Sequence, residues 1–327
     1  TTLTGDITVT TANGALSFDG TLDGNNDLSI TAGTGNINFD NKVGNTTALK
    51  DVTIVSAATL DTDDVFKANS FTQNAGTVKT QFDGVVTLSG AMDFTGQVLT
   101  LNGTGSNTVS GKMDVTNAGV FTTNDDVTLT VGTEFKQDGA GTNTIGGNIT
   151  SSNDGITFAT AVTLDGTDGE TITFQTGEGT GDDILLSSTL DSNVNEDILF
   201  DAGAAGNITV TGTTNVGTGD VTVRDAAVTL FTGKVTADNY TQNDGTTSTT
   251  FSTAFDIGTE TSDAFDFTGQ VLTLNGTGSN TVSGKMDVTN AGVFTTANGA
   301  NITAVGGFTQ DGLANSSLGG NITTTNT

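Results

Sequence analysis

The chain of 327 residues contains no cysteine, histidine, proline or tryptophan. Without cysteine it has no disulfide bond, thiol nucleophile or zinc–thiolate site. Without histidine it lacks the commonest metal ligand and the commonest general acid–base group. These two absences exclude three large classes of active site.

Positive charge is also scarce, with nine basic residues against 37 acidic ones and a formal net charge of −28. Such a chain repels nucleic-acid phosphates and anionic membrane surfaces, so we expect neither as a partner. No apolar run approaches the ~20 residues of a membrane span, and we expect no membrane insertion.

A long internal duplication organises what is present. The segment Asp93–Thr123 recurs without a change as Asp266–Thr296, and weaker similarity extends to both sides of each copy. We predict two tandem modules, residues 1–153 and 154–327. No proline-rich or charged linker separates Ile149-Thr150 from Ile156-Thr157, so we expect one continuous core across the module boundary.

A shorter rhythm within each module predicts the fold class. Apolar-polar-apolar triplets such as Ile7–Val9, Leu16–Phe18 and Leu28–Ile30 alternate with corners of Gly, Asn and Asp. This spacing indicates short β-strands with one buried face, and no stretch has helical periodicity. We predict an all-β protein, a parallel β-solenoid in which ~20 to 25 residues form each of about 13 to 16 turns. The lack of proline fits, because proline would remove a donor from the ladder.

Several strings resemble the strand repeats of large secreted bacterial proteins: Gly5–Val9, Leu22–Gly33 and Phe71–Gly76. The likeness is to filamentous-haemagglutinin-type and autotransporter passenger domains. It implies a right-handed parallel β-helix (β-solenoid) outside the cell, with a role in adhesion, biofilm or surface structure. It implies no catalytic residues.

Clustered aspartates are the candidate metal ligands, because calcium binds six to eight oxygens that carboxylates and carbonyls in loops can supply. Neither an EF-hand loop nor a calcium-binding nonapeptide is present, so solvated corners are the alternative. The candidate residues are Asp61, Asp63, Asp64, Asp125, Asp126, Asp182 and Asp183.

Enzymatic and glycan-binding functions are the alternatives to a structural role. A polysaccharide-degrading site would pair carboxylates with a basic residue, but no compact Asp/Lys/Arg group surrounds the single arginine, Arg224, in the sequence. We predict no enzyme and no cofactor. Surface glycans are the alternative partner, although Tyr240 is the only Tyr and there is no Trp to stack on a sugar.

The two ends of the chain suggest a homopolymer. Open strand edges in a solenoid must be capped or paired. The first strand, with Ile7 and Val9, resembles the turn that follows the first-module copy of Ile322-Thr323. We therefore expect copies to stack head to tail, with the Ile322 edge against the Ile7 edge.

Overall fold

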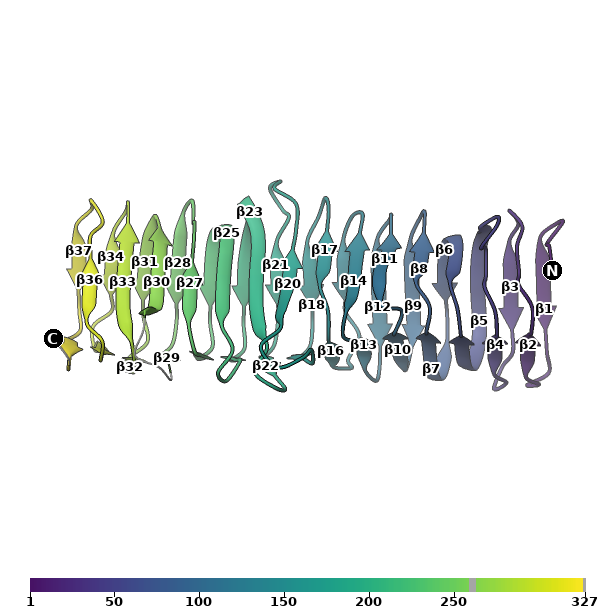
Figure 1. Ribbon diagram of the computed structural model, residues 1–327, viewed down its shortest axis with the longest axis horizontal. Helices are drawn as coiled ribbons and strands as arrows, with labels where there is room; N and C mark the ends of the chain where they lie inside the picture. The colour runs from purple at the N-terminus through teal and green to yellow at the C-terminus, as the bar shows by residue number, and fades with distance from the viewer. Residues whose placement is uncertain (259–262, 326–327) are drawn as a thin grey trace. The chain divides into compact units, whose positions relative to one another are not determined.

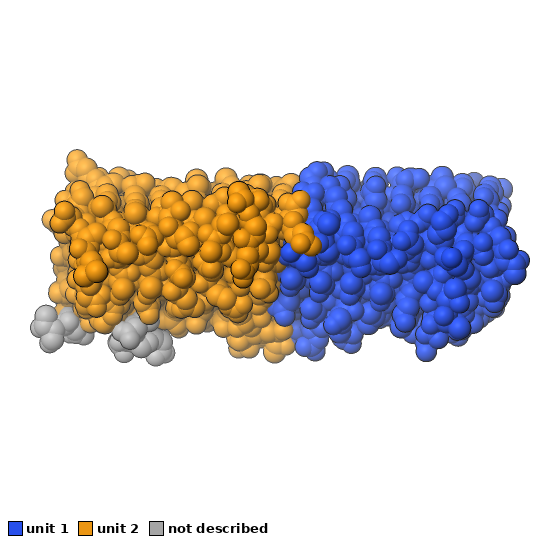
Figure 2. All heavy atoms as spheres, turned by 90° about the horizontal axis from the view of Figure 1, so that it is seen from above, with its two compact units in different colours: residues 1–152 blue, residues 153–327 orange. Residues whose placement is uncertain are grey.

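The computed structural model describes residues 1–258 and 263–325, and all the regular structure it describes there is β-strand. The strands are parallel and stack into a β-solenoid of about 15 turns, which confirms the predicted fold class and number of turns. The chain divides into two compact units, residues 1–152 and 153–327 (Figure 2). The described part contains no helix that is long and apolar enough to cross a membrane.

Most turns of unit 1 contribute one strand to each of three faces, so a strand usually pairs with the strand three places further along (Figure 1). The first turns reach the third face only through the isolated bridges of Thr2, Leu22 and Val43. The first face holds β1 (Ile7–Thr10), β3 (Leu28–Thr31), β9 (Met92–Gly96), β12 (Met113–Asn117) and β15 (Phe135–Gln137). The second face holds β2 (Leu16–Phe18), β4 (Ile37–Phe39), β7 (Gly76–Phe82), β10 (Val98–Leu101), β13 (Phe121–Thr123) and β16 (Asn143–Ile145). The third face holds β8 (Val86–Leu88), β11 (Gly105–Val109), β14 (Val127–Val131) and β17 (Ile149–Ser151). Two longer strands, β5 (Leu49–Thr62) and β6 (Phe66–Gln73), bend round a corner and pair on two faces.

Unit 2 repeats this three-face arrangement. One face holds β18 (Ile156–Phe158), β21 (Ile184–Leu186), β28 (Ser248–Phe251), β31 (Val271–Leu274), β34 (Phe294–Thr296) and β37 (Ser316–Leu318). Another holds β19 (Val162–Leu164), β22 (Leu190–Ser192), β24 (Thr214–Asn215), β26 (Val235–Ala237), β29 (Phe255–Ile257), β32 (Gly278–Val282), β35 (Ala300–Ala304) and β38 (Ile322–Thr324). The remaining face holds β20 (Thr171–Gln175), β27 (Tyr240–Gln242), β30 (Asp263–Gly269), β33 (Lys285–Asn290) and β36 (Phe308–Gln310). The long strands β23 (Asp197–Val210) and β25 (Val221–Phe231) pair on two faces.

The alternation of residue types accounts for the strands, because every second side chain in a strand points inward. Each turn places its apolar residues on those of the turn before, as in Leu28 on Ile7 and Ile37 on Leu16. Aromatic rings pack against one another in the core: Phe66, Phe71 and Phe82 meet edge to face with ring centroids 5.3 to 5.7 Å apart. The core of each unit is therefore a set of apolar columns parallel to the solenoid axis.

Corners require the residues that tolerate left-handed backbone. Asn13 has φ 64° and Gly33, one turn later, has φ 62°. The Oδ1 atom of Asn13 accepts a hydrogen bond from the backbone N–H of Thr34 at 3.0 Å, and a Cβ atom at Gly33 would lie 2.2 Å from that oxygen. A glycine is needed there for both space and backbone conformation.

A buried polar network lies beneath one corner of unit 1, and the duplication repeats it in unit 2. Gln137 is 0% exposed, and its Nε2 donates to Asn117 Oδ1 at 2.7 Å and to the carbonyl oxygen of Gly139 at 2.8 Å. In unit 2, Gln310 Nε2 donates to Asn290 Oδ1 at 2.8 Å. These amides donate to carbonyl oxygens of the corner from the buried side, so they fix how the corner packs on the core.

We expect Gln137→Leu to lower the free energy of unfolding by about 1 to 3 kcal/mol for each buried acceptor left without its donor. The matched control is Gln310→Leu, because Gln310 makes the equivalent bond but is only half-buried. Water can replace the lost donor there, so its loss should be smaller. Urea unfolding followed by circular dichroism measures both changes, and equal losses would contradict the role assigned to burial.

Candidate functional site

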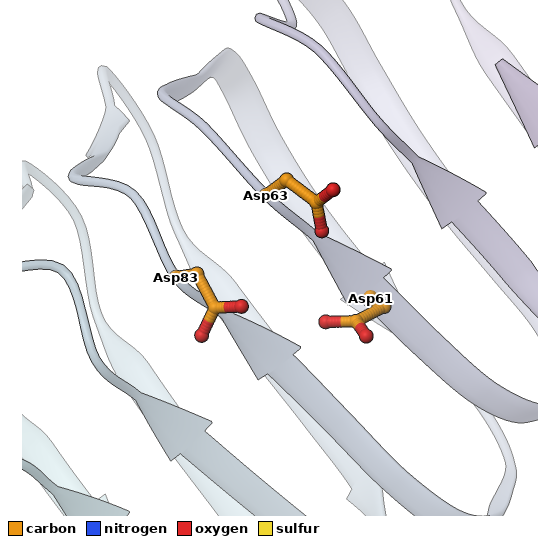
Figure 3. Close-up of side chains that lie close together, drawn as sticks. All are labelled: Asp61, Asp63 and Asp83. Carbon is orange, nitrogen blue, oxygen red and sulfur yellow. The ribbon is translucent and has the colours of Figure 1, made fainter. Parts of the chain in front are cut away.

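Three carboxylates converge at one corner of unit 1. Asp61 lies on β5, Asp63 follows that strand, and Asp83 follows β7 in the next turn (Figure 3). One carboxylate oxygen from each lies within 4.8 Å of the others. The parallel register creates this group, because it places Asp61 beside Gln81 and so brings the residues after both strands together.

Burial raises the pKa of Asp61 above its ordinary value. The positive charge of Lys79 opposes this shift, while repulsion from Asp83, Asp63 and Asp40 adds to it. Its Oδ1 atom is buried and accepts no hydrogen bond. The surroundings of Asp61 therefore disfavour the charged form of its carboxyl group.

Asp61 and Asp63 were predicted as ligands from the sequence, whereas Asp83 was not. Its position after a β-strand, 20 residues beyond Asp63, matches one turn of the solenoid, and this is the signal that identifies it. Asp83 Oδ1 already accepts hydrogen bonds from Gln81 Nε2 and Asn102 Nδ2, each at 2.6 Å. Three carboxylates offer at most six oxygens, and with Asp83 Oδ1 engaged they offer fewer than the six to eight that calcium prefers, so calcium here stays a prediction.

The other predicted ligands lie apart from this group, and the carboxylates of Asp64, Asp125, Asp182 and Asp183 accept hydrogen bonds from backbone N–H groups. Asp64 Oδ1 accepts from Val65 N at 2.7 Å, and Asp125 Oδ1 accepts from Asp126 N at 3.1 Å. Asp182 Oδ2 accepts from Gly179 N at 2.7 Å. Asp183 Oδ1 accepts from both the backbone N–H and the side-chain amide of Asn207, one turn later.

Other aspartates at corners also accept hydrogen bonds from backbone N–H groups of the following turn. Asp6 Oδ1 accepts from the backbone N–H of Asp27, and Asp27 Oδ1 accepts from that of Asp51. In unit 2, Asp197 Oδ1 accepts from Asp220 N at 2.8 Å, and Asp220 Oδ1 accepts from Asn239 N at 3.1 Å. Each carboxylate thus joins one turn to the next, and much of the acidic composition has a structural use.

A second polar group surrounds Arg224. Its guanidinium Nη1 lies 3.0 Å from Asp201 Oδ2, and Asp201 is only 8% exposed. Burial raises the pKa of neighbouring Asp225, with further contributions from the charges of Asp244, Asp201 and Glu178. The sequence did not reveal this group, because its members come from different turns. Arg224 serves here as the ion-pair partner of Asp201, and the absence of catalysis stays a prediction.

A groove of about 430 Å³ follows another corner of unit 1. Its lining comes from Asn74–Thr77, Thr95–Gln97, Thr116–Ala118 and Ala140, and no aromatic side chain is among these residues. The groove therefore offers hydroxyl and amide groups without a stacking platform for a sugar ring. Glycan binding stays a prediction.

The predicted assembly residues lie on the terminal turns. Ile7 and Val9 are on β1, which pairs with β3, and Ile322 and Thr323 are on β38, which pairs with β35. No other pairing of β1 or β38 is found among residues 1–258 and 263–325.

Comparison with family models, with curated proteins and with solved structures finds no match to this chain. Its function must therefore be argued from its own residues.

We expect the contribution of Asp61 to the stability of the protein to fall as pH rises from the ordinary pKa of aspartate through the raised pKa of folded Asp61. The sign follows because the folded chain keeps a proton there that the unfolded chain has already lost. Asp61→Asn should weaken this pH dependence and be more stable than the parent at neutral pH. Thermal unfolding between pH 3.5 and 7.5 measures the effect.

The control is Asp168→Asn, which removes an exposed carboxylate from a corner loop. If both variants shift the stability profile equally, the effect is one of net charge and the local explanation fails.

Proposed function

We propose that this protein is an extracellular structural element, a β-solenoid subunit that stacks head to tail into a surface or matrix filament. The observation that carries the proposal is a core cross-section exposed at both terminal turns. The location outside the cell is supported by the resemblance to secreted repeat proteins.

The amino-terminal turn exposes residue types that the next turn buries. Ile7 is 39% exposed, whereas its register partner Leu28 is 1% exposed. Leu16 and Phe18 are half-buried, whereas their partners Ile37 and Phe39 are 0% and 1% exposed. One more turn of solenoid on this end would complete their burial.

The carboxyl-terminal turn shows the same contrast. Leu318 is 54% exposed, and Phe308 and Ile322 are half-buried. In the preceding turn Phe294 and Ile302 are 0% and 1% exposed. Both ends therefore offer apolar side chains together with unpaired strand edges, the combination that favours strand-to-strand association.

Charge hardly opposes contact between the two ends. From Val288 to the end of the chain the only charged side chain is Asp311, although the net charge of the whole chain is −28. The amino-terminal turn carries Asp6, Asp19 and the ammonium group of Thr1. Both terminal turns therefore carry little net charge, and repulsion between them is weak.

The gain from apolar burial and the cost of association are of comparable size. Full burial of one large aliphatic or aromatic side chain contributes about 1.5 to 3 kcal/mol, and each of the partly exposed side chains at an end would gain a part of that. Association costs about 4 to 15 kcal/mol, so apolar burial and the new ladder of hydrogen bonds act together.

A stalk within an adhesin is the second form of the proposal. In that form further solenoid turns of a longer polypeptide would cover the same two ends. The role is structural in both forms.

We expect Ile7→Lys to abolish end-to-end assembly, because it places a charge in the apolar cross-section. Val55→Lys is the matched control: Val55 is also β-branched and is 38% exposed, against 39% for Ile7, but it lies on a side of unit 1. Sedimentation velocity and electron microscopy at increasing concentration should show filaments for the parent and for Val55→Lys only. Dispersed single copies of the parent at every concentration would overturn the proposal.

A further inference from the structure

We propose that the head-to-tail junction has a single rotational register, in which β1 stacks on β37, β2 on β38, and Thr2 on the β36 face of the neighbouring copy. This inference rests on the proposed function and deepens it, because it specifies which surfaces of two copies meet.

The order in which the chain passes through the three faces determines which strands meet at the junction. The last three strands, β36, β37 and β38, occupy three different faces in that order. Any strand that continues the spiral must stack on β36. The amino-terminal turn runs from Thr2, which bridges to Asp23, through β1 to β2. Placing Thr2 on the β36 face therefore brings β1 to β37 and β2 to β38.

Only this rotation closes the junction without a gap. Three rotations preserve the parallel strand direction, because the faces follow one another in the same cyclic order at both ends. In the other two rotations the spiral of one copy does not continue into that of the next. Part of a turn is then either missing or occupied twice where the copies meet, so strand edges stay unpaired. One of these two brings Ile7 to Ile322, the pairing expected from the sequence, so the three-face order revises that expectation.

The alternation of inward and outward side chains, together with the length of the strands, fixes which residues of the two copies pair. Ile322 and Thr324 point inward because they pair with buried Ile302 and Ala304. On β2 the inward residues are Leu16 and Phe18, which pair with Ile37 and Phe39. A slip of one residue would turn the apolar side chains outward, and a slip of two would leave only one residue of each three-residue strand paired. Ile322 therefore meets Leu16, and outward Thr323 meets outward Ser17.

The same alternation places Leu318 of β37 against Val9 of β1. Leu318 follows Thr296 in its column, and Val9 precedes Ile30. Leu318 and Val9 thus cover each other, and Ile7 stacks on Ser316 in the column of Phe294.

The lack of cysteine permits a direct test by cross-linking. Register partners in adjacent parallel strands lie ~4.8 Å apart, within the ~4.4 to 6.8 Å between Cα atoms that a disulfide bridges. Chains carrying Thr323→Cys are mixed with chains carrying Ser17→Cys, Thr8→Cys or Thr2→Cys, one mixture for each rotation. All four positions are exposed. Each single variant oxidised alone gives the background.

We expect covalent dimers on a non-reducing gel from the Ser17→Cys mixture, at least tenfold above background, and none above background from the other two. Preferential cross-linking with Thr8→Cys or Thr2→Cys, or equal cross-linking with all three, overturns the register while light scattering still reports assembly. No cross-link together with no scattering overturns the proposed function itself. The two failures are thus distinguishable.

Discussion

The constraint on which the rest of the structure depends is parallel register: apart from bulges in a few strand pairs, a residue in a strand sits directly over its partner one turn earlier. Because partners repeat at the strand spacing, like side chains must stack on like, and an apolar column continues only if each turn supplies an apolar residue at that place. The columns through Leu28 and Ile37 meet this condition in adjacent turns. A terminal turn has a neighbouring turn on one side only, so the same constraint leaves its apolar side chains partly exposed.

The constraint also decides what a charged residue can do. An aspartate at a corner lies beside the backbone of the next turn, so its carboxylate can cap a strand there, as Asp27 and Asp197 do. Where corner aspartates of two successive turns lie beside an aspartate on a strand, their carboxylates converge, as at Asp61 and Asp83. Capping and crowding are two results of one geometry, and burial rather than ligand binding explains the raised pKa of Asp61.

Strand positions could be predicted from the sequence because they follow from local alternation, as in Ile7–Val9 and Leu16–Phe18. Pairing could not, because the corners vary in length: 24 residues separate Leu28 from its partner Val52, whereas 19 separate Val52 from Phe71. Without that register neither the three faces nor the neighbours of Asp61 can be assigned. Asp83 was missed for this reason, and so was the group around Arg224.

The duplicated segment shows how far local sequence governs local structure in such a fold. Asn107 and Asn280 occupy equivalent places in the two copies, and each donates from Nδ2 to a glycine carbonyl four residues earlier, Gly103 and Gly276. Outside the identical residues the copies differ in charge, since Asp125 and Asp126 correspond to Asn298 and Gly299. Only this stretch after the identical residues has lost charge, because the second module as a whole carries the larger net negative charge. Surface charge thus changes in both directions while the strand positions stay. The register constrains the inward residues of each strand, so the corners are free to diverge after duplication without any change of fold.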